Sequence, residues 1–355
     1  MNLEELGYND NLARYRVDNS LESFEVGRVI TEHRERYIVK TVKGEYDAEI
    51  TGNMRYTASG REGFPAVGDW VSLIIYEPNT AIINHIFPRS SIIKRSDISK
   101  PGEIQIIATN IDFALITQAV DRDFNLNRLE RYLAICNEAG VKPVIIITKI
   151  DLVDDILINE FVESIISRVG DLPVFALSSV TKKGYDQLAD FVKKGKTYCM
   201  LGSSGAGKST MLNNLSGATL MRTGSISQST SKGKHVTTHR ELFILDNGAI
   251  IIDNPGMKEV GIADSQSGIE MTFDMISQLS SSCRYQDCTH THEAGCAVTE
   301  AVEKGTLSRN AYENYVKMVK EMAYFRTSAA EKKKKDKTLG KILKNYVKNN
   351  PEKYT

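Results

Sequence analysis

Nine residues constrain the fold and the ligand of this chain more than any other segment. They read Gly202-Ser203-Ser204-Gly205-Ala206-Gly207-Lys208-Ser209-Thr210 and satisfy the phosphate-loop pattern G-x-x-x-x-G-K-[ST] without a substitution. Glycines let the backbone curl so that its N–H groups face a phosphate, while Lys208 reaches the β and γ phosphates and Ser209 can bind Mg²⁺. Residues 197–201 resemble a buried strand and 208–215 a helix that begins at the loop. A Gly/Ser linker is the alternative, but it needs no Gly-Lys-Ser at a strand–helix junction.

A second motif indicates which base is bound. Thr148-Lys149-Ile150-Asp151 follows a predicted strand at 143–148, and an Asp there can accept hydrogen bonds from guanine N1–H and the 2-amino group. Adenine offers neither donor. The segment resembles the N-K-x-D motif of GTPases, with Thr148 in the place of Asn, so we expect a looser tie to the phosphate loop. Leu177-Ser178-Ser179 resembles the S-A-x loop, whose backbone N–H contacts guanine O6.

A fourth motif concerns Mg²⁺ and the γ-phosphate. Asp253-Asn254-Pro255-Gly256 fits D-x-x-G at the end of a strand, where the Asp holds Mg²⁺ through water and the Gly256 N–H contacts the γ-phosphate. Thr237 or Thr238 is the candidate second hydroxyl ligand of Mg²⁺. Four motifs at strand ends together predict GTP binding. A transporter-type ATPase shares the phosphate loop, but the chain has no L-S-G-G-Q signature, and Asp151 also argues against it.

The catalytic residues differ from those of most GTPases. Met257 follows D-x-x-G, where a Gln often orients the attacking water, so we expect slow intrinsic hydrolysis. His235, in the stretch that contains Thr237, is the best replacement because an imidazole can order or polarise water. Its alternative is a loop histidine without a catalytic role. Lys208 completes the expected catalytic set.

The order of the motifs predicts a circular permutation. Asp151 and Ser178 precede Gly202, and Asp253 comes last, whereas ordinary GTPases begin with the phosphate loop. The same loops are then cut at a different place, because sheet contacts do not depend on where the termini lie. We therefore expect the D-x-x-G segment to run directly into a C-terminal domain and to transmit its ordering there.

The chain divides into three expected domains. Residues 1–95 contain five short apolar segments separated by turns, which favours an RNA-binding OB-fold barrel. Residues 96–263 alternate strand and helix patterns, which predicts a mainly parallel sheet covered by helices. Residues 264–355 form a zinc-binding and helical domain with a Lys-rich tail.

The basic and aromatic barrel residues that fit RNA are Arg34, Arg36, Lys40, Lys43, Arg55, Arg61, Tyr37, Tyr46 and Tyr56. An ordinary solvated barrel surface explains them equally well.

Three of the five cysteines fall close together with a histidine. Cys283-x4-Cys288-x-His290-x5-Cys296 is the ligand set of one closed, structural Zn²⁺ site. His292 is also near, and we choose His290. The alternative is a set of unrelated core cysteines. Cys136 and Cys199 lie in predicted core elements and are most simply buried hydrophobes.

The net charge of the whole chain indicates no binding partner, but one local segment is strongly basic. Lys+Arg and Asp+Glu balance at 45 each, yet residues 331–355 carry nine Lys against three acids. This tail fits contact with rRNA, or it is a solvated helix end. The acidic N-terminus without an apolar segment, and the lack of an apolar run near 18 residues, predict a cytoplasmic protein without membrane contact.

Together these motifs resemble a known family. The barrel, the permuted GTPase motifs, Met257 and the Cys283/Cys288/His290/Cys296 spacing closely resemble the bacterial small ribosomal subunit biogenesis GTPases of the RsgA/YjeQ type, over about residues 24–325. The resemblance implies an OB-fold, a circularly permuted GTPase domain and a zinc-finger domain. It also implies a monomer that binds the small subunit and its rRNA, hydrolyses GTP there, acts late in maturation and helps to release another assembly factor. The alternative is a GTP-dependent RNA-binding switch in which hydrolysis is incidental.

Overall fold

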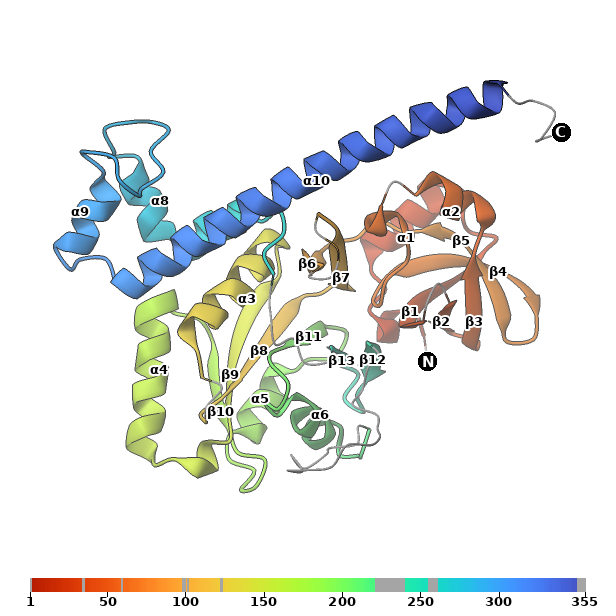
Figure 1. Ribbon diagram of the computed structural model, residues 1–355. Coiled ribbons are helices and arrows are strands. Elements are labelled where there is room, and N and C mark those ends of the chain that lie inside the picture. Colours follow the sequence, from red (N-terminus) through yellow and green to blue (C-terminus); the bar gives the residue numbers. More distant parts are fainter. Residues whose placement is uncertain are drawn as a thin grey trace, which may run out of the picture.

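The computed structural model describes residues 2–33, 36–58, 60–97, 100, 102–121, 124–220, 240–254 and 261–349. Figure 1 shows an N-terminal barrel, a central sheet with helices on both sides, and C-terminal helices that end in the long helix α10. This is the multidomain α/β fold expected from the sequence. Within the described residues, no helix has both the length and the hydropathy that crossing a membrane requires.

The barrel has five strands: β1 (Glu25–His33), β2 (Arg36–Thr41), β3 (Gly44–Ile50), β4 (Trp70–Glu77) and β5 (Thr80–Ile86). They join in the order β1-β2-β3-β5-β4, and β4 pairs back onto β1 to close the barrel. β3 and β5 are parallel, while the other neighbours are antiparallel. Val29, Val39 and Ile83 fill the interior. The predicted OB-type barrel is confirmed, because this order and closure are those of a five-stranded Greek-key barrel.

Short helices flank the barrel: η1 (Glu4–Leu6), α1 (Asp10–Asp18), α2 (Gly52–Thr57) and η2 (Arg61–Gly63). Helix α1 begins at Asn9, whose side chain accepts hydrogen bonds from the N–H groups of Asn11 and Leu12. Thr51 caps α2 in the same way, so residues 51–53 start a helix rather than the turn expected from the sequence. Both helices are short and polar, and periodicity did not reveal them.

One expected RNA-facing residue is buried. Tyr37 is only 1% exposed and lies in the barrel core, because its position on β2 points inward. Tyr56 on α2 is 91% exposed, and Tyr46 is half-buried against the barrel core. The expectation was therefore wrong for Tyr37, while Arg34 lies outside the described residues.

The central sheet contains six strands: β8 (Phe113–Ala119), β9 (Lys142–Thr148), β10 (Val174–Leu177), β11 (Thr197–Leu201), β12 (Glu241–Ile244) and β13 (Ile250–Asp253). Their order is β10-β9-β8-β11-β13-β12, and all neighbours are parallel except β12 and β13. The connecting helices are η3 (Ile150–Leu152), α3 (Leu126–Glu138), α4 (Asp155–Val169), α5 (Tyr185–Phe191) and α6 (Lys208–Ser216). The predicted strand–helix alternation is confirmed. The carboxyl ends of the parallel strands therefore share one edge, where ligands of such sheets bind.

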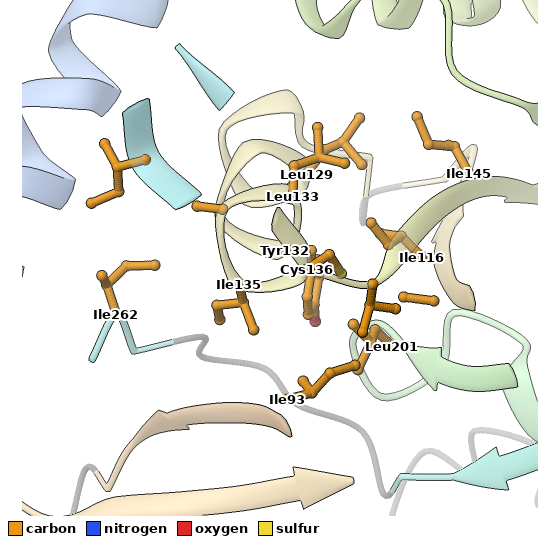
Figure 2. Close-up of a cluster of buried hydrophobic side chains, with 14 of the residues drawn as sticks. Ile93, Ile116, Leu129, Tyr132, Leu133, Ile135, Cys136, Ile145, Leu201 and Ile262 are labelled. Carbon is orange, nitrogen blue, oxygen red and sulfur yellow. The ribbon is translucent and has the colours of Figure 1, made fainter. Parts of the chain in front are cut away.

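Apolar side chains from alternate strand positions form two cores, one on each face of the sheet. On one face, Leu129, Leu133 and Cys136 of α3 pack against sheet residues such as Ile116 and Leu201 (Figure 2). On the other face, α5 and α6 cover residues that include Met200 and Ile251. Cys136 and Cys199 are both fully buried in the first core, as predicted.

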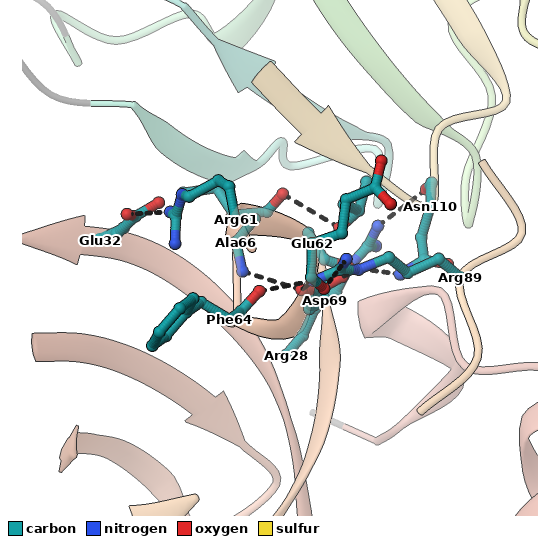
Figure 3. A network of polar contacts seen from close by, with 12 residues as sticks. Arg28, Glu32, Arg61, Glu62, Phe64, Ala66, Asp69, Arg89 and Asn110 are labelled. Atoms are coloured by element: carbon teal, nitrogen blue, oxygen red, sulfur yellow. Dashed lines mark hydrogen bonds and ion pairs between the residues drawn. The ribbon is translucent and has the colours of Figure 1, made fainter. Parts of the chain in front are cut away.

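The barrel and the central sheet form one continuous sheet of eleven strands. Strand β12 pairs antiparallel with β1 of the barrel, with Thr31 opposite Glu241. The fully buried Arg28 also connects the barrel to the central sheet by hydrogen bonds. Its guanidinium donates to the Leu6 carbonyl at 2.8 Å and to the hydroxyl of Thr197 on β11 at 3.0 Å. Nearby, Arg89 pairs with the buried carboxylate of Asp69 (Figure 3).

A hairpin and four helices complete the structure: β6 (Ile92–Ser96), β7 (Ile104–Thr109), α7 (Gln266–Thr272), α8 (Asp274–Ser280), α9 (Ala297–Glu303) and α10 (Arg309–Asn349). Glu130 of α3 joins this group to the central domain. Its carboxylate is 1% exposed and accepts from Arg168 Nε at 2.5 Å and Asn314 Nδ2 at 2.6 Å. Three helices, α3, α4 and α10, thus share one buried charge.

Candidate nucleotide site and metal centre

The phosphate-loop residues connect β11 to α6 in a conformation that requires glycine. Gly202 has φ +147°, and a Cβ there would lie 2.4 Å from the Thr117 carbonyl oxygen of β8. Gly207 also has positive φ, at +90°, immediately before the first residue of α6. Lys208 Nζ donates to the carbonyls of Gly202 at 2.8 Å and Ser203 at 2.7 Å. The loop therefore curls around its own lysine at the carboxyl edge of the sheet, and Ser209 and Thr210 follow in the first turn of α6.

Thr148 connects the candidate guanine loop to the phosphate loop. Its hydroxyl donates to the Ala206 carbonyl at 2.7 Å, and Gln118 O lies 3.3 Å away. Thr148 therefore links the two loops by a hydrogen bond, although we expected this link to be looser without the usual asparagine. Lys149 has a left-handed backbone, φ +61°, and its ammonium pairs with Asp121 at 2.6 Å. Ile150 turns into the core and anchors the loop.

Asp151 is exposed and held by a side chain from the next loop. The hydroxyl of Ser178 donates to Asp151 Oδ1 at 2.6 Å, and the same hydroxyl accepts from the N–H of Thr181 at 3.1 Å. The Ser178 N–H donates to the Lys183 carbonyl at 3.1 Å. The Ser179 N–H is therefore the better candidate donor to a base oxygen. The sequence motifs predict that both loops lie at the site, but no pattern in them predicts the Ser178–Asp151 hydrogen bond.

Asp253 ends β13 beside the phosphate loop. It is 2% exposed, and Oδ1 accepts no hydrogen bond from any described residue. Burial raises the pKa of Asp253 to about 6, and the Lys208 ammonium opposes this rise. A buried carboxylate oxygen without a partner fits a divalent cation, and Ser209 offers the hydroxyl oxygen that Mg²⁺ also prefers. Asp253 and Ser209 are thus compatible with Mg²⁺.

Several expected site residues cannot be placed. His235, Thr237 and Thr238, and also Gly256 and Met257 of the D-x-x-G segment, lie outside the described residues. The structure places the remaining nucleotide candidates together at one sheet edge.

Cys283, Cys288, His290 and Cys296 converge between α8 and α9, with their ligand atoms within 4.8 Å of one another. His290 Nδ1 lies 3.6 Å from Cys283 Sγ and 3.5 Å from Cys296 Sγ, and the two sulfurs are 3.9 Å apart. Tetrahedral Zn²⁺ at ordinary bond lengths requires about 3.5 Å between nitrogen and sulfur and about 3.8 Å between sulfurs. The four residues therefore fit a tetrahedral metal ion such as zinc.

The surroundings of the two histidines favour His290 over His292 as the metal ligand. The Ser280 hydroxyl lies 2.9 Å from His290 Nε2, which fixes the ring with Nδ1 toward the thiols. His290 is buried, whereas His292 is exposed. Ser280 gave no signal in the sequence, because a helical serine ten residues away has no characteristic spacing.

The comparisons with known proteins agree with this geometry. A model of the RsgA GTPase family matches residues 86–263. The small ribosomal subunit biogenesis GTPase RsgA 1 of Listeria innocua is 42% identical over 331 residues, which cover 92% of this chain and 93% of that protein. This chain belongs to the RsgA GTPase family.

Solved structures support the family fold. YjeQ from Thermotoga maritima is similar with a TM-score of 0.59 at 24% identity, covering 84% of this chain and 98% of that one. YloQ, described as a circularly permuted GTPase, is similar with a TM-score of 0.57 at 26% identity, covering 85% and 96%. The permutation predicted from motif order is thus confirmed. A model of ABC transporters also matches residues 186–342, a range that contains the shared phosphate loop.

Proposed function

We propose that this chain hydrolyses GTP slowly by itself and faster on the small ribosomal subunit, at a late step of that subunit's maturation. That it is a P-loop GTPase assisting small-subunit biogenesis follows from its family. The observation that carries the nucleotide assignment is the connected set of Asp151, Ser178 and Thr148, which joins a base-reading carboxylate to the phosphate loop.

Guanine selection rests on Asp151. With Ser178 bonded to Oδ1, the carboxylate has a fixed orientation and accepts from guanine N1–H and the 2-amino group. The Ser179 N–H donates to O6, and the Lys149 side chain lies along the base. Adenine offers neither of these two base donors, so binding it would desolvate the carboxylate without replacing the hydrogen bonds that the carboxylate makes to water.

Triphosphate binding rests on the loop from Gly202 to Thr210. We propose that the backbone N–H groups of this loop bind the phosphates and that Lys208 binds the β and γ phosphates. To do so, the Lys208 ammonium gives up its hydrogen bonds to the carbonyls of Gly202 and Ser203. Ser209 and Asp253, with Thr237 and Thr238 as further candidates, hold Mg²⁺, which neutralises the charge of the phosphates when bound.

Hydrolysis then depends on residues near the γ-phosphate. We assign the Gly256 N–H to the γ-phosphate and His235 to the attacking water, since Met257 has no polar group for that task. Without a partner to fix these residues, water is poorly oriented and turnover is slow.

We further propose rRNA contact by the barrel of residues 1–95 and by the Lys-rich tail of the domain from 264 to 355. Arg55 and Tyr56 on α2 support the barrel contact, because both are exposed and their residue types suit phosphate contact and base stacking. We also propose a monomer, Zn²⁺ in the Cys3His centre, and a role in releasing another assembly factor.

Nucleotide selectivity provides the test of the site. We expect Asp151→Asn to lower GTP turnover at limiting substrate by about 100-fold, from the loss of two hydrogen bonds to a charged group. Xanthosine triphosphate should become the better substrate, because xanthine replaces the 2-amino donor with an acceptor. Asp155→Asn is the control, since Asp155 is exposed and its ion pair among the described residues is with Lys183 on the surface. Unchanged preference for GTP in Asp151→Asn would remove Asp151 from the base site.

A further inference from the structure

Strand β1 is shared between the barrel and the central sheet. Its first half, Glu25 to Arg28, pairs with β4 and closes the barrel. The pairing with β2 then shifts register between Val29 and Thr31, and Thr31 pairs with Glu241 of β12. A bulge of this kind bends a strand and redirects its end. The second half of β1 thus stays paired with β2, but its other edge pairs with β12 of the GTPase domain instead of β4.

Strand β12 lies between β1 and β13, so one residue faces both neighbours. Glu241 is opposite Thr31 on the barrel side and opposite Asp253 on the other side. Asp253 opens the D-x-x-G motif, and Glu241 follows closely on the sequence that contains Thr237 and Thr238. Only one strand therefore separates the barrel from the candidate Mg²⁺ carboxylate.

The residues next to this pairing carry opposite charges. Continuing the antiparallel register by one position sets Glu32 of β1 across from Arg240. Glu32 Oε1 accepts from Arg61 of η2, while Oε2 is buried and accepts no hydrogen bond from the described residues (Figure 3). Burial lowers the pKa of Arg240, and among the neighbouring charges Glu32 opposes this most strongly. A barrel carboxylate is thus the charge that most favours the charged form of Arg240.

We propose that the opposite charges of Glu32 and Arg240 position β12 against β1, and that the nucleotide state of the GTPase and the conformation of barrel strand β1 are coupled through this charge pair. The pair links the strand that follows the Thr237 region to the strand that closes the barrel. On the barrel side, the Glu32 carboxylate also forms an ion pair with Arg61 of η2.

The coupling requires that the two nucleotide states differ in their contacts, and we place that difference in the D-x-x-G segment that begins at Asp253. GTP would offer this segment a γ-phosphate that GDP lacks, and the difference would act on the end of β13. A shift of β13 moves β12, to which it is paired along its length from Glu241 to Ile244. By linkage, any barrel ligand that prefers one β1 conformation alters nucleotide affinity by the same factor.

The inference rests on the proposed nucleotide roles of the motifs, but its test does not need the ribosome. Amide hydrogen exchange over residues 25–41 should be measured in the full chain with GDP and with a non-hydrolysable GTP analogue. We expect exchange in β1 to differ by about threefold or more between the two states in the wild type. In Glu32→Gln this difference should disappear, while both nucleotides still bind.

Matched variants keep the result interpretable. Glu49→Gln removes another barrel carboxylate, which pairs with Arg36 at 3.6 Å on the exposed surface, and should retain the nucleotide-dependent difference. Arg240→Met removes the other partner and should behave like Glu32→Gln, which also covers the case that one variant does not fold. Equal exchange in both states of the wild type, or a difference that persists in Glu32→Gln and Arg240→Met, overturns the proposal. Failure of subunits to stimulate turnover would instead contradict the proposed function.

Discussion

At the end of β13, Asp253 holds a charge at a position where water cannot solvate it. Its pKa of about 6 lies above the usual value near 4 for Asp, so the folded protein binds a proton there more tightly than the unfolded chain. The stability from this proton is complete below the unfolded pKa and is lost as the pH rises through about 6. Without metal and nucleotide, Asp253 therefore destabilises the fold at neutral pH, as expected for a buried carboxylate that we propose to be a ligand of Mg²⁺.

Asp253→Asn should remove this effect. In chelator, and without nucleotide, we expect the variant to be more stable than the wild type by about 3 kcal/mol above pH 7 and by about half of that at pH 5. Urea unfolding across this pH range measures the difference. Asp246→Asn, in the exposed turn between β12 and β13, is the control that should show no such trend. A gap between Asp253→Asn and wild type that does not change with pH would contradict the account.

At the scale of elements, periodicity and turn chemistry predicted the strands well. The strand at 197–201 has the bounds that the sequence indicated, and the strand predicted at 143–148 begins only one residue earlier, because both are short apolar runs. The hairpin β6–β7 and the polar helices α1 and α2 were missed, since tertiary packing and capping rather than periodicity stabilise them. The pairing of β1 with β12 could not be predicted either, because sequence patterns do not give the partner of an edge strand.

The Cys3His cluster is the other element-scale feature that the sequence predicted. Four candidate metal ligands within fourteen positions are a local pattern, whereas the position of Ser280 beside His290 is evident only from the fold. The lesson is that residues which bind ligands directly follow local motifs, while those that orient them depend on distant packing.

Elemental analysis should find about one Zn²⁺ per chain, held by three thiolates and one imidazole. Cys296→Ser should lose the metal and leave the α8–α9 region sensitive to proteolysis, because so small a domain depends on the metal for its folding. His292→Ala should keep the metal, since His292 is exposed and His290 faces the thiols. A metal-free wild type, or loss of metal in His292→Ala, would contradict this assignment.

At the scale of the whole molecule, both flanking domains contact the chain on either side of the candidate Mg²⁺ site. Before Asp253, β12 pairs with the barrel through Thr31. Beyond the D-x-x-G segment, the Ile262 N–H donates to Glu321 of α10 at 2.8 Å, and the Gly261 carbonyl accepts from the Ser96 N–H of the hairpin at 3.2 Å. In the function that we propose, a subunit that engages the barrel and α10 at once would act on both ends of the segment that carries Asp253.

GTP turnover with and without purified small ribosomal subunits tests this central claim most directly. We expect subunits to raise the turnover rate by about tenfold or more, because they fix the residues that orient the attacking water. Purified large subunits serve as the control and should leave the rate unchanged. Turnover that is equally slow with and without small subunits would contradict the account.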